Sequence, residues 1–308
     1  MGKKYQFTFT ILFIILTILT IQITLKTNST LVEKASSSNI SQETTENTIT
    51  EAVWIDNITF DAGIKINEIM PYKSDYIAIG QEDNTPFMQL IHVENDEVIN
   101  KGFPYLFTEG TGEVVDITIH DYFITTTIDN NDSIITQDFI EYNDHFIPFY
   151  KKQIQYNYDK DLTINPKYLV IHETANTGIG ADADAHYRYW NSNPTANAST
   201  HFVVDSTQIY QMLELNQAAW HVGDNHNHSD ITNLNSIGIE VAVNEDGDFS
   251  EARQNAIELT IHLMKTLNMD ISQLKRHYDA SGKNCPTNML QQPELWNDFV
   301  QQVEQALN

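Results

Sequence analysis

The alternation of apolar and polar residues divides this chain into parts of different character. Residues 27–50 contain almost no large apolar side chains, and residues 51–157 carry short β-branched and aromatic runs between Asn, Asp and Gly turns. From residue 158 onward, strand-like runs are separated by segments of helical composition. The pattern therefore predicts a flexible tether, a small all-β domain and an α/β domain that spans residues 158–308.

The last part shows the clearest elements. Strand-like runs lie at 167–172, 201–205, 208–212 and 236–243, and helical segments lie at 180–190, 250–267 and from Pro293 to the end. Ser250 is the expected N-cap of the second of these helices. Strands separated by helices predict a central mixed β-sheet that is flanked by helices.

A weak internal repeat is visible within the predicted all-β domain. Residues 66–80 resemble residues 115–127, with Asp75-Tyr76 aligned on Asp121-Tyr122. The offset of about 46 to 48 residues corresponds to one four-stranded β-meander. Two copies are too few to close a propeller, so we expect a small antiparallel sheet domain, with chance similarity as the alternative.

The first 26 residues have the pattern of a targeting segment. Lys3 and Lys4 precede a run without charged residues, from Tyr5 to Leu25, and such a run is long enough to span a bilayer as a helix. The two lysines place the remaining chain outside the cytoplasm. We therefore expect residues 1–26 to be a retained signal-anchor in the membrane, with a cleaved signal peptide as the alternative.

Composition and charge exclude several classes of function. The 308 residues are 41% hydrophobic, which suffices for two packed cores, and the formal net charge is −25. A chain this acidic would not neutralise phosphates, so we expect no nucleic-acid partner and no adhesion to anionic lipid heads. The single cysteine excludes an intramolecular disulfide.

That cysteine lies in the stretch with the clearest candidate metal ligands. Cys285 ends the run SGKNC, His277 lies eight residues earlier, and His172 ends a short apolar run far upstream. A thiolate and two imidazoles suit Zn²⁺, and three protein ligands leave a fourth position for water. The alternative is that Cys285 is a small buried hydrophobic residue.

Five segments occur here in the order found in one known family: VIHETANTG, STHFVVD, AAWHVGD, SIGIEVAVN and RHYDASGKNCP. Together, from about residue 167 to 290, they resemble the zinc-dependent N-acetylmuramoyl-L-alanine amidases of the type 2 family, which are related to phage lysozyme-type amidases and peptidoglycan-recognition proteins. The resemblance implies the fold of those proteins. It covers under half of the chain and does not extend to residues 27–157.

The resemblance also implies a role for individual residues. The implied zinc ligands are His172, His277 and Cys285. The implied catalytic residues are Glu240 as the carboxylate and Lys283 as the cation beside the reacting carbonyl. The implied substrate-binding residues are Trp220, His221, Thr200 and Asn176. Some relatives carry a tyrosine at the position of Thr200. Because this chain has threonine there, we assign the catalytic role to Glu240 and not to a tyrosine.

These residue types suit hydrolysis of an amide. A carboxylate such as Glu240 can take a proton from water and deliver it to the leaving amine, and the Lys283 ammonium can stabilise a developing oxyanion. The resemblance implies the substrate, so we expect an extracytoplasmic, monomeric enzyme that cuts peptidoglycan between N-acetylmuramic acid and L-alanine. A non-catalytic peptidoglycan receptor and a zinc peptidase acting within the stem peptide are the alternatives. Cys285 favours an enzyme, because a receptor needs no thiolate.

Overall fold

The computed structural model describes residues 64–308, except residues 84, 95–96, 103, 108–111, 121–122, 130–132, 143–144 and 224–228. The predicted signal-anchor at 1–26 and the predicted tether at 27–50 lie outside the described residues. No helix in the described part of the chain is long and apolar enough to cross a membrane. The described residues all belong to one compact unit.

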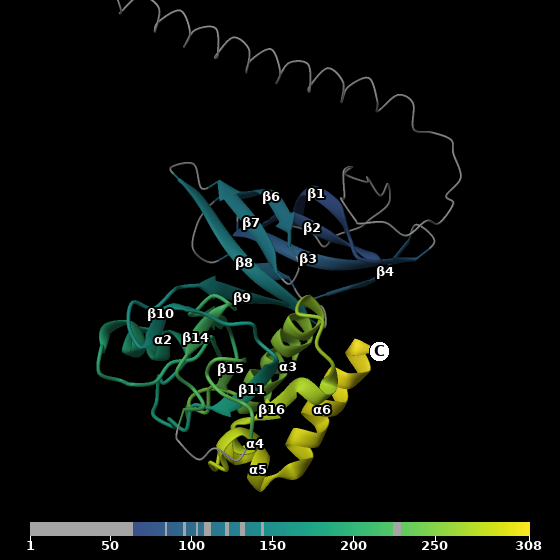
Figure 1. Cartoon of the computed structure of the whole chain (residues 1–308). Coiled ribbons are helices and arrows are strands. Elements are labelled where there is room, and N and C mark those ends of the chain that lie inside the picture. The colour runs from purple at the N-terminus through teal and green to yellow at the C-terminus, as the bar shows by residue number, and fades with distance from the viewer. Residues whose placement is uncertain are drawn as a thin grey trace, which may run out of the picture. The chain divides into compact units, whose positions relative to one another are not determined.

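Two consecutive β-meanders form the first half of this unit (Figure 1). The first comprises β1 (Ile64–Tyr72), β2 (Asp75–Glu82), β3 (Thr85–Glu94) and β4 (Glu97–Lys101), with the short β5 (Tyr105–Leu106) beside β3. The second comprises β6 (Glu113–Ile119), β7 (Ile124–Asp129), β8 (Ile134–Tyr142) and β9 (His145–Lys151). The strands of the second meander begin 48 or 49 residues after their counterparts in the first. This spacing agrees with the repeat that the sequence predicts.

Apolar side chains of both meanders share one core. Met88 of the first meander and Ile124 of the second are almost completely buried within it. Phe139 of β8 packs edge-on against Tyr105 and Phe107, with ring centroids 4.6 and 5.7 Å apart. The burial of these large side chains holds the two meanders together.

The second half is the predicted α/β fold, built on a central mixed sheet. Its strands are β11 (Tyr168–Glu173), β12 (Phe202–Val204), β13 (Ile209–Gln211), β15 (Ser236–Val241) and β16 (Leu274–Arg276), and β10 (Tyr158–Thr163) pairs separately with β14 (Gln217–Ala219). The sheet has the order β16-β11-β15-β12-β13-β9-β8-β7-β6. The four strands from β16 to β12 run parallel, and β12 and β13 form an antiparallel hairpin.

The second meander is thus part of the central sheet. Strand β9 pairs in parallel with β13, and Lys152 and Ile154 continue the contact by donating from their backbone N–H groups to Gln211 and Met212. The sheet therefore contains strands from both sides of residue 158, where the alternation pattern changes. The independent folding of residues 158–308 stays a prediction.

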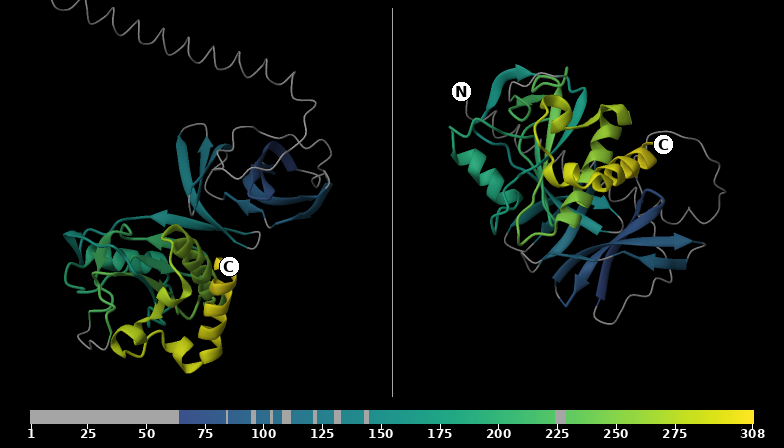
Figure 2. Two further views of the ribbon diagram at one scale, coloured as in Figure 1. Left: turned by 45° about the vertical axis from the view of Figure 1, so that its right-hand side comes forward. Right: turned by 90° about the horizontal axis from the view of Figure 1, so that it is seen from below.

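Helices cover both faces of the sheet (Figure 2). Helix α3 (Phe249–Thr266) and helix α6 (Pro293–Leu307) bury their apolar sides against Phe202 and Val204, whereas α2 (Ala183–Ser192) packs on Val203. Successive strand residues point to opposite faces, so α2 lies across the sheet from α3. Asp248, not Ser250 as expected, caps α3, because its carboxylate accepts from the N–H groups of Ser250 and Glu251.

Candidate metal centre

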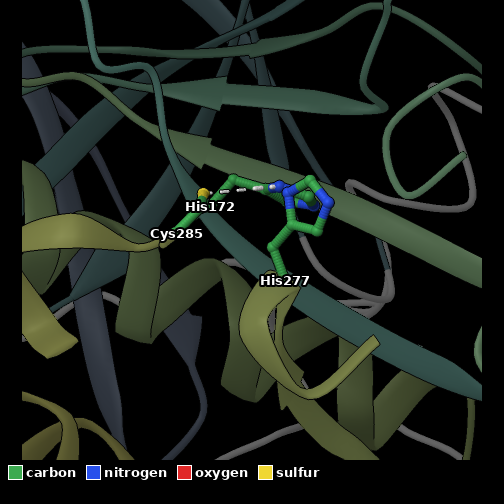
Figure 3. A group of neighbouring side chains, drawn as sticks. All are labelled: His172, His277 and Cys285. Carbon is green, nitrogen blue, oxygen red and sulfur yellow. Dashed lines mark hydrogen bonds between the residues drawn. The ribbon is translucent and has the colours of Figure 1, made fainter. Parts of the chain in front are cut away.

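Three buried side chains meet at the C-terminal end of β11. His172 comes from β11, His277 begins α4 (His277–Ser281), and Cys285 precedes α5 (Thr287–Gln291). Their donor atoms all lie within 4.8 Å of one another, and Cys285 Sγ is 3.8 Å from His172 Nδ1 (Figure 3). The structure therefore brings together the three predicted zinc ligands.

Local backbone structure explains why His277 and Cys285 reach His172. Strand β16 pairs in parallel with β11, with Arg276 opposite Ile171, so the chain enters α4 beside His172. The Asp279 carboxylate accepts hydrogen bonds from the backbone and guanidinium of Arg276, which fixes this entry. The backbone N–H of Tyr278 donates to the Cys285 carbonyl at 2.8 Å, and this bond brings the cysteine back to the start of α4.

A chain of hydrogen bonds sets the tautomer of His172. Its Nε2 lies 3.0 Å from His221 Nδ1, and His221 Nε2 lies 3.3 Å from the Ser236 carbonyl and 3.1 Å from the Ser236 hydroxyl. A carbonyl oxygen can only accept, so His221 donates from Nε2 and accepts at Nδ1. His172 therefore donates from Nε2 and presents the Nδ1 lone pair to the other two donors, as a metal ligand requires.

The pKa values of His172 and Cys285 suit the binding of a metal ion. Burial lowers the pKa of His172 well below its usual value, and the neighbouring imidazoles and the Lys283 ammonium lower it further. Burial raises the pKa of the Cys285 thiol to about 12, and the Glu240 carboxylate contributes to the same shift. The neutral His172 imidazole is ready to bind a metal ion, whereas the Cys285 thiolate needs a cation beside it at neutral pH. Two imidazoles and one sulfur in a buried triad suit Zn²⁺.

Glu240 lies beside the triad on the adjacent strand. It is directly opposite His172 in the parallel register of β11 and β15, and its Oε1 is 3.9 Å from His172 Nδ1. Its Oε2 is buried and has no hydrogen-bond partner in the described part of the chain. Burial raises the pKa of Glu240 to about 7, against the opposing effect of the Lys283 ammonium. Such a carboxyl group can accept and release a proton near neutral pH.

The remaining predicted residues lie in different surroundings. Lys283 is exposed in the turn between α4 and Cys285. Asn176 is exposed and lines a pocket of about 300 Å³ with Thr174, His186 and other residues, just beyond the end of β11.

Trp220 lines another pocket of about 270 Å³, together with Val222, Ile231 and other residues. Thr200 is fully buried, and His221 is 8% exposed and lies behind His172. Direct contact of these side chains with substrate stays a prediction.

Sequence reasoning missed Ser236, Gly238 and Glu173. Ser236 ends the hydrogen-bond chain from His172, and the His221 ring packs so closely on Gly238 that an added Cβ would lie 2.7 Å from His221 Nδ1. Glu173 directly follows His172, one of the predicted metal ligands, and its carboxylate contacts the start of α5. The glycine within SIGIE and the carboxylate next to His172 were the available signals.

Comparison with known proteins agrees with the resemblance seen in the sequence. A profile of the family described as N-acetylmuramoyl-L-alanine amidase matches residues 162–288. The N-acetylmuramoyl-L-alanine amidase XlyA of Bacillus subtilis (strain 168) is 44% identical over 136 residues, which are 44% of this chain and 43% of XlyA. CwlH of the same organism is 40% identical over 141 residues, which are 46% of this chain and 54% of CwlH. The chain thus spans about half the length of these curated relatives.

Solved structures with similar sequences each match about half of the chain. The catalytic domain of XlyA is 39% identical, with a TM-score of 0.46 over 50% of this chain and 98% of that domain. The structure of PlyL is 29% identical, with a TM-score of 0.45 over 51% of this chain and 96% of PlyL.

Proposed function

We propose that the protein is a zinc-dependent N-acetylmuramoyl-L-alanine amidase, because residues 162–288 match the profile of that family. Its substrate is the amide bond between N-acetylmuramic acid and the L-alanine of the stem peptide in peptidoglycan. The observation that supports this proposal is the buried triad of His172, His277 and Cys285 with the Glu240 carboxyl group beside it.

Zinc, when bound by these three residues, lowers the pKa of water toward about 7 and polarises the scissile carbonyl. The protein's own groups handle the protons. Glu240 accepts the proton of the attacking water and then delivers it to the departing nitrogen of L-alanine. The buried Oε2, which has no hydrogen-bond partner among the described residues, is the atom available for this transfer.

Two further groups support the reaction. Lys283 carries a positive charge near the triad, where it can stabilise negative charge on the substrate carbonyl oxygen. His221 holds the ring of His172 through the 3.0 Å hydrogen bond and keeps its Nδ1 lone pair directed at the metal position. Thr174 and Asn176, which line one of the pockets, follow His172 by two and four residues in the sequence. This position suits the pocket for binding part of the muramyl peptide.

The site of action follows from the substrate. Peptidoglycan lies outside the cytoplasmic membrane, so the enzyme works there, either anchored by residues 1–26 or released into the wall. Fractionation of cells with N-terminal sequencing of the mature protein distinguishes these two forms. A mature chain that begins near residue 38 in the medium would rule out the anchor.

Digestion of purified peptidoglycan tests the activity. We expect mass spectrometry to find intact stem peptides that begin with L-alanine, together with glycan strands that have lost them. Chelation of the metal should abolish the release, and the Glu240→Gln variant should slow it by about 10²–10⁴-fold. Cleavage inside the stem peptide would identify a peptidase instead. Binding to peptidoglycan without any product would identify a receptor.

A further inference from the structure

Glu173 is a buried carboxylate beside the metal centre that the proposed chemistry does not use. It is the last residue of β11, directly after His172, and only 4% of it is exposed. Strand residues alternate between faces, so its side chain points to the face opposite that of His172. There its Oε2 accepts from the backbone N–H of Asn288 at 2.8 Å, and its Oε1 accepts from that of Met289 at 3.1 Å.

The backbone of Glu173 contacts the same segment. Strand β16 pairs with β11 only from Leu169 to Ile171, so the ladder ends two residues before Glu173. At that point the Glu173 carbonyl lies 3.9 Å from Cys285 Sγ, within hydrogen-bonding distance for a thiol. Glu173 therefore holds the segment after Cys285 with both side-chain oxygens and contacts the sulfur itself with its carbonyl.

The segment is also held by the Tyr278 N–H bond to the Cys285 carbonyl and by the burial of Met289 in the core. Helix α5 is five residues long, and the N–H groups of its first turn have no partners within the helix. Two of these groups donate to one carboxylate, and hydrogen bonds to an ionised acceptor are about twice as strong as neutral ones. Asn288 is three residues after Cys285, so a shift of α5 would move the sulfur away from the two imidazoles.

We propose that Glu173 is a positioning residue for Cys285, which places the sulfur at the distance from His172 and His277 that a metal ion requires. This inference rests on the proposed metal site. It predicts that the carboxylate governs metal affinity and thiol exposure, although it contacts neither metal nor substrate.

The variant that tests this role is Glu173→Gln. Glutamine keeps the shape of the side chain, but its NH₂ group would face one of the two N–H donors, so one hydrogen bond is lost and two donors oppose each other. Glu258→Gln is the matched control, because Glu258 is also a buried carboxyl group, 6% exposed, but lies on α3 in a pocket lined by Lys73, His262 and other residues outside the metal centre.

Two measurements on the full chain decide the question. Zinc affinity, measured by competition with a chelator, should fall about 10- to 100-fold in Glu173→Gln, as is typical when a partner behind a metal ligand is removed. It should stay within about threefold of the unmodified value in Glu258→Gln. In the metal-free protein, alkylation of Cys285, the only cysteine, should become about tenfold faster in Glu173→Gln alone, because the segment opens more often.

The outcomes separate this inference from the proposed function. If the unmodified protein binds no zinc, the proposed metal site fails, and the alkylation rates still decide whether Glu173 holds the Cys285 segment. If Glu173→Gln binds zinc as the unmodified protein does and its thiol reacts at the same rate, the positioning role is refuted. An equal loss of thermal midpoint in both variants, without those changes, means that Glu173 is an ordinary buried carboxyl group.

Discussion

Gly238 offers a direct test of how the metal centre is packed. It lies in the middle of β15, and its backbone N–H donates to His201 Nδ1 at 3.1 Å. A Cβ at this position would lie 2.7 Å from His221 Nδ1 and 2.8 Å from Thr200 Oγ1. The Gly238→Ala variant therefore adds one methyl group directly against the ring that holds His172.

These distances determine how much folding stability the Gly238→Ala substitution removes. Heavy atoms in contact prefer a separation of about 3.5 Å or more, so the His221 ring must retreat by about 0.8 Å. That retreat stretches its 3.0 Å hydrogen bond to His172 beyond useful length. Overpacking a core costs about 1–3 kcal/mol, and a buried group that loses its partner costs about 1–3 kcal/mol more. We expect the free energy of unfolding to fall by about 2–6 kcal/mol.

Denaturant unfolding of the metal-free protein measures this loss, and chelator competition measures the accompanying loss of zinc affinity, about 10- to 100-fold. Gly178→Ala is the control, because its added methyl group would meet only the Asn176 side-chain oxygen, at 3.3 Å. This control should change the free energy of unfolding by less than about 0.5 kcal/mol. If Gly238→Ala unfolds with the same free energy and binds zinc with the same affinity as the unmodified chain, the close packing of Gly238 against His221 is refuted.

Three further variants test the roles of single side chains. Cys285→Ser should lose most of the bound zinc, as measured by atomic emission, because a neutral hydroxyl replaces the thiolate. Glu240→Gln should keep zinc and the thermal midpoint but lose about 10²–10⁴ in kcat on peptidoglycan, and a fully active variant would move the base elsewhere. His201 has its pKa lowered to about 4 by burial, so the unfolded chain takes up its proton first as the pH falls from about 6.5. Between pH 6.5 and 4, the free energy of unfolding should therefore fall by about 3 kcal/mol less in His201→Gln than in the unmodified protein. Denaturant unfolding across that pH range measures the difference.

The sequence predicted the features that follow from local pattern. Alternation of apolar and polar residues predicted the strand-rich character of residues 51–157, and the run before His172 predicted the buried strand that carries it. The recognised segments gave the three metal donors, which the structure brings within 4.8 Å of one another. The strands were predictable because neighbouring residues determine the apolar periodicity, whereas the three metal donors followed from the family resemblance.

Other features depend on contacts between distant parts of the chain. The pairing of β9 with β13 joins backbone groups about 60 residues apart, and backbone pairing carries little side-chain signature. The tautomer of His172 depends on Ser236, which contacts it only through His221. Burial of Thr200 likewise follows from packing on Gly238 rather than from its own sequence context.

The geometry of the sheet explains why recognisable segments so far apart in the sequence form one site. Parallel strands end at the same edge of a sheet, so His172 at the end of β11 and Glu240 near the end of β15 become neighbours once the two strands pair. Strand β16 stops earlier along β11 and thereby leaves space at that edge, and the chain that follows β16 fills the space with His277 and Cys285. A shift of one residue in the β11–β15 register would turn either His172 or Glu240 to the opposite face, where α3 packs. The close packing of Gly238 against His221 and Thr200 opposes such a shift, because any larger residue brought to that position would clash with the ring.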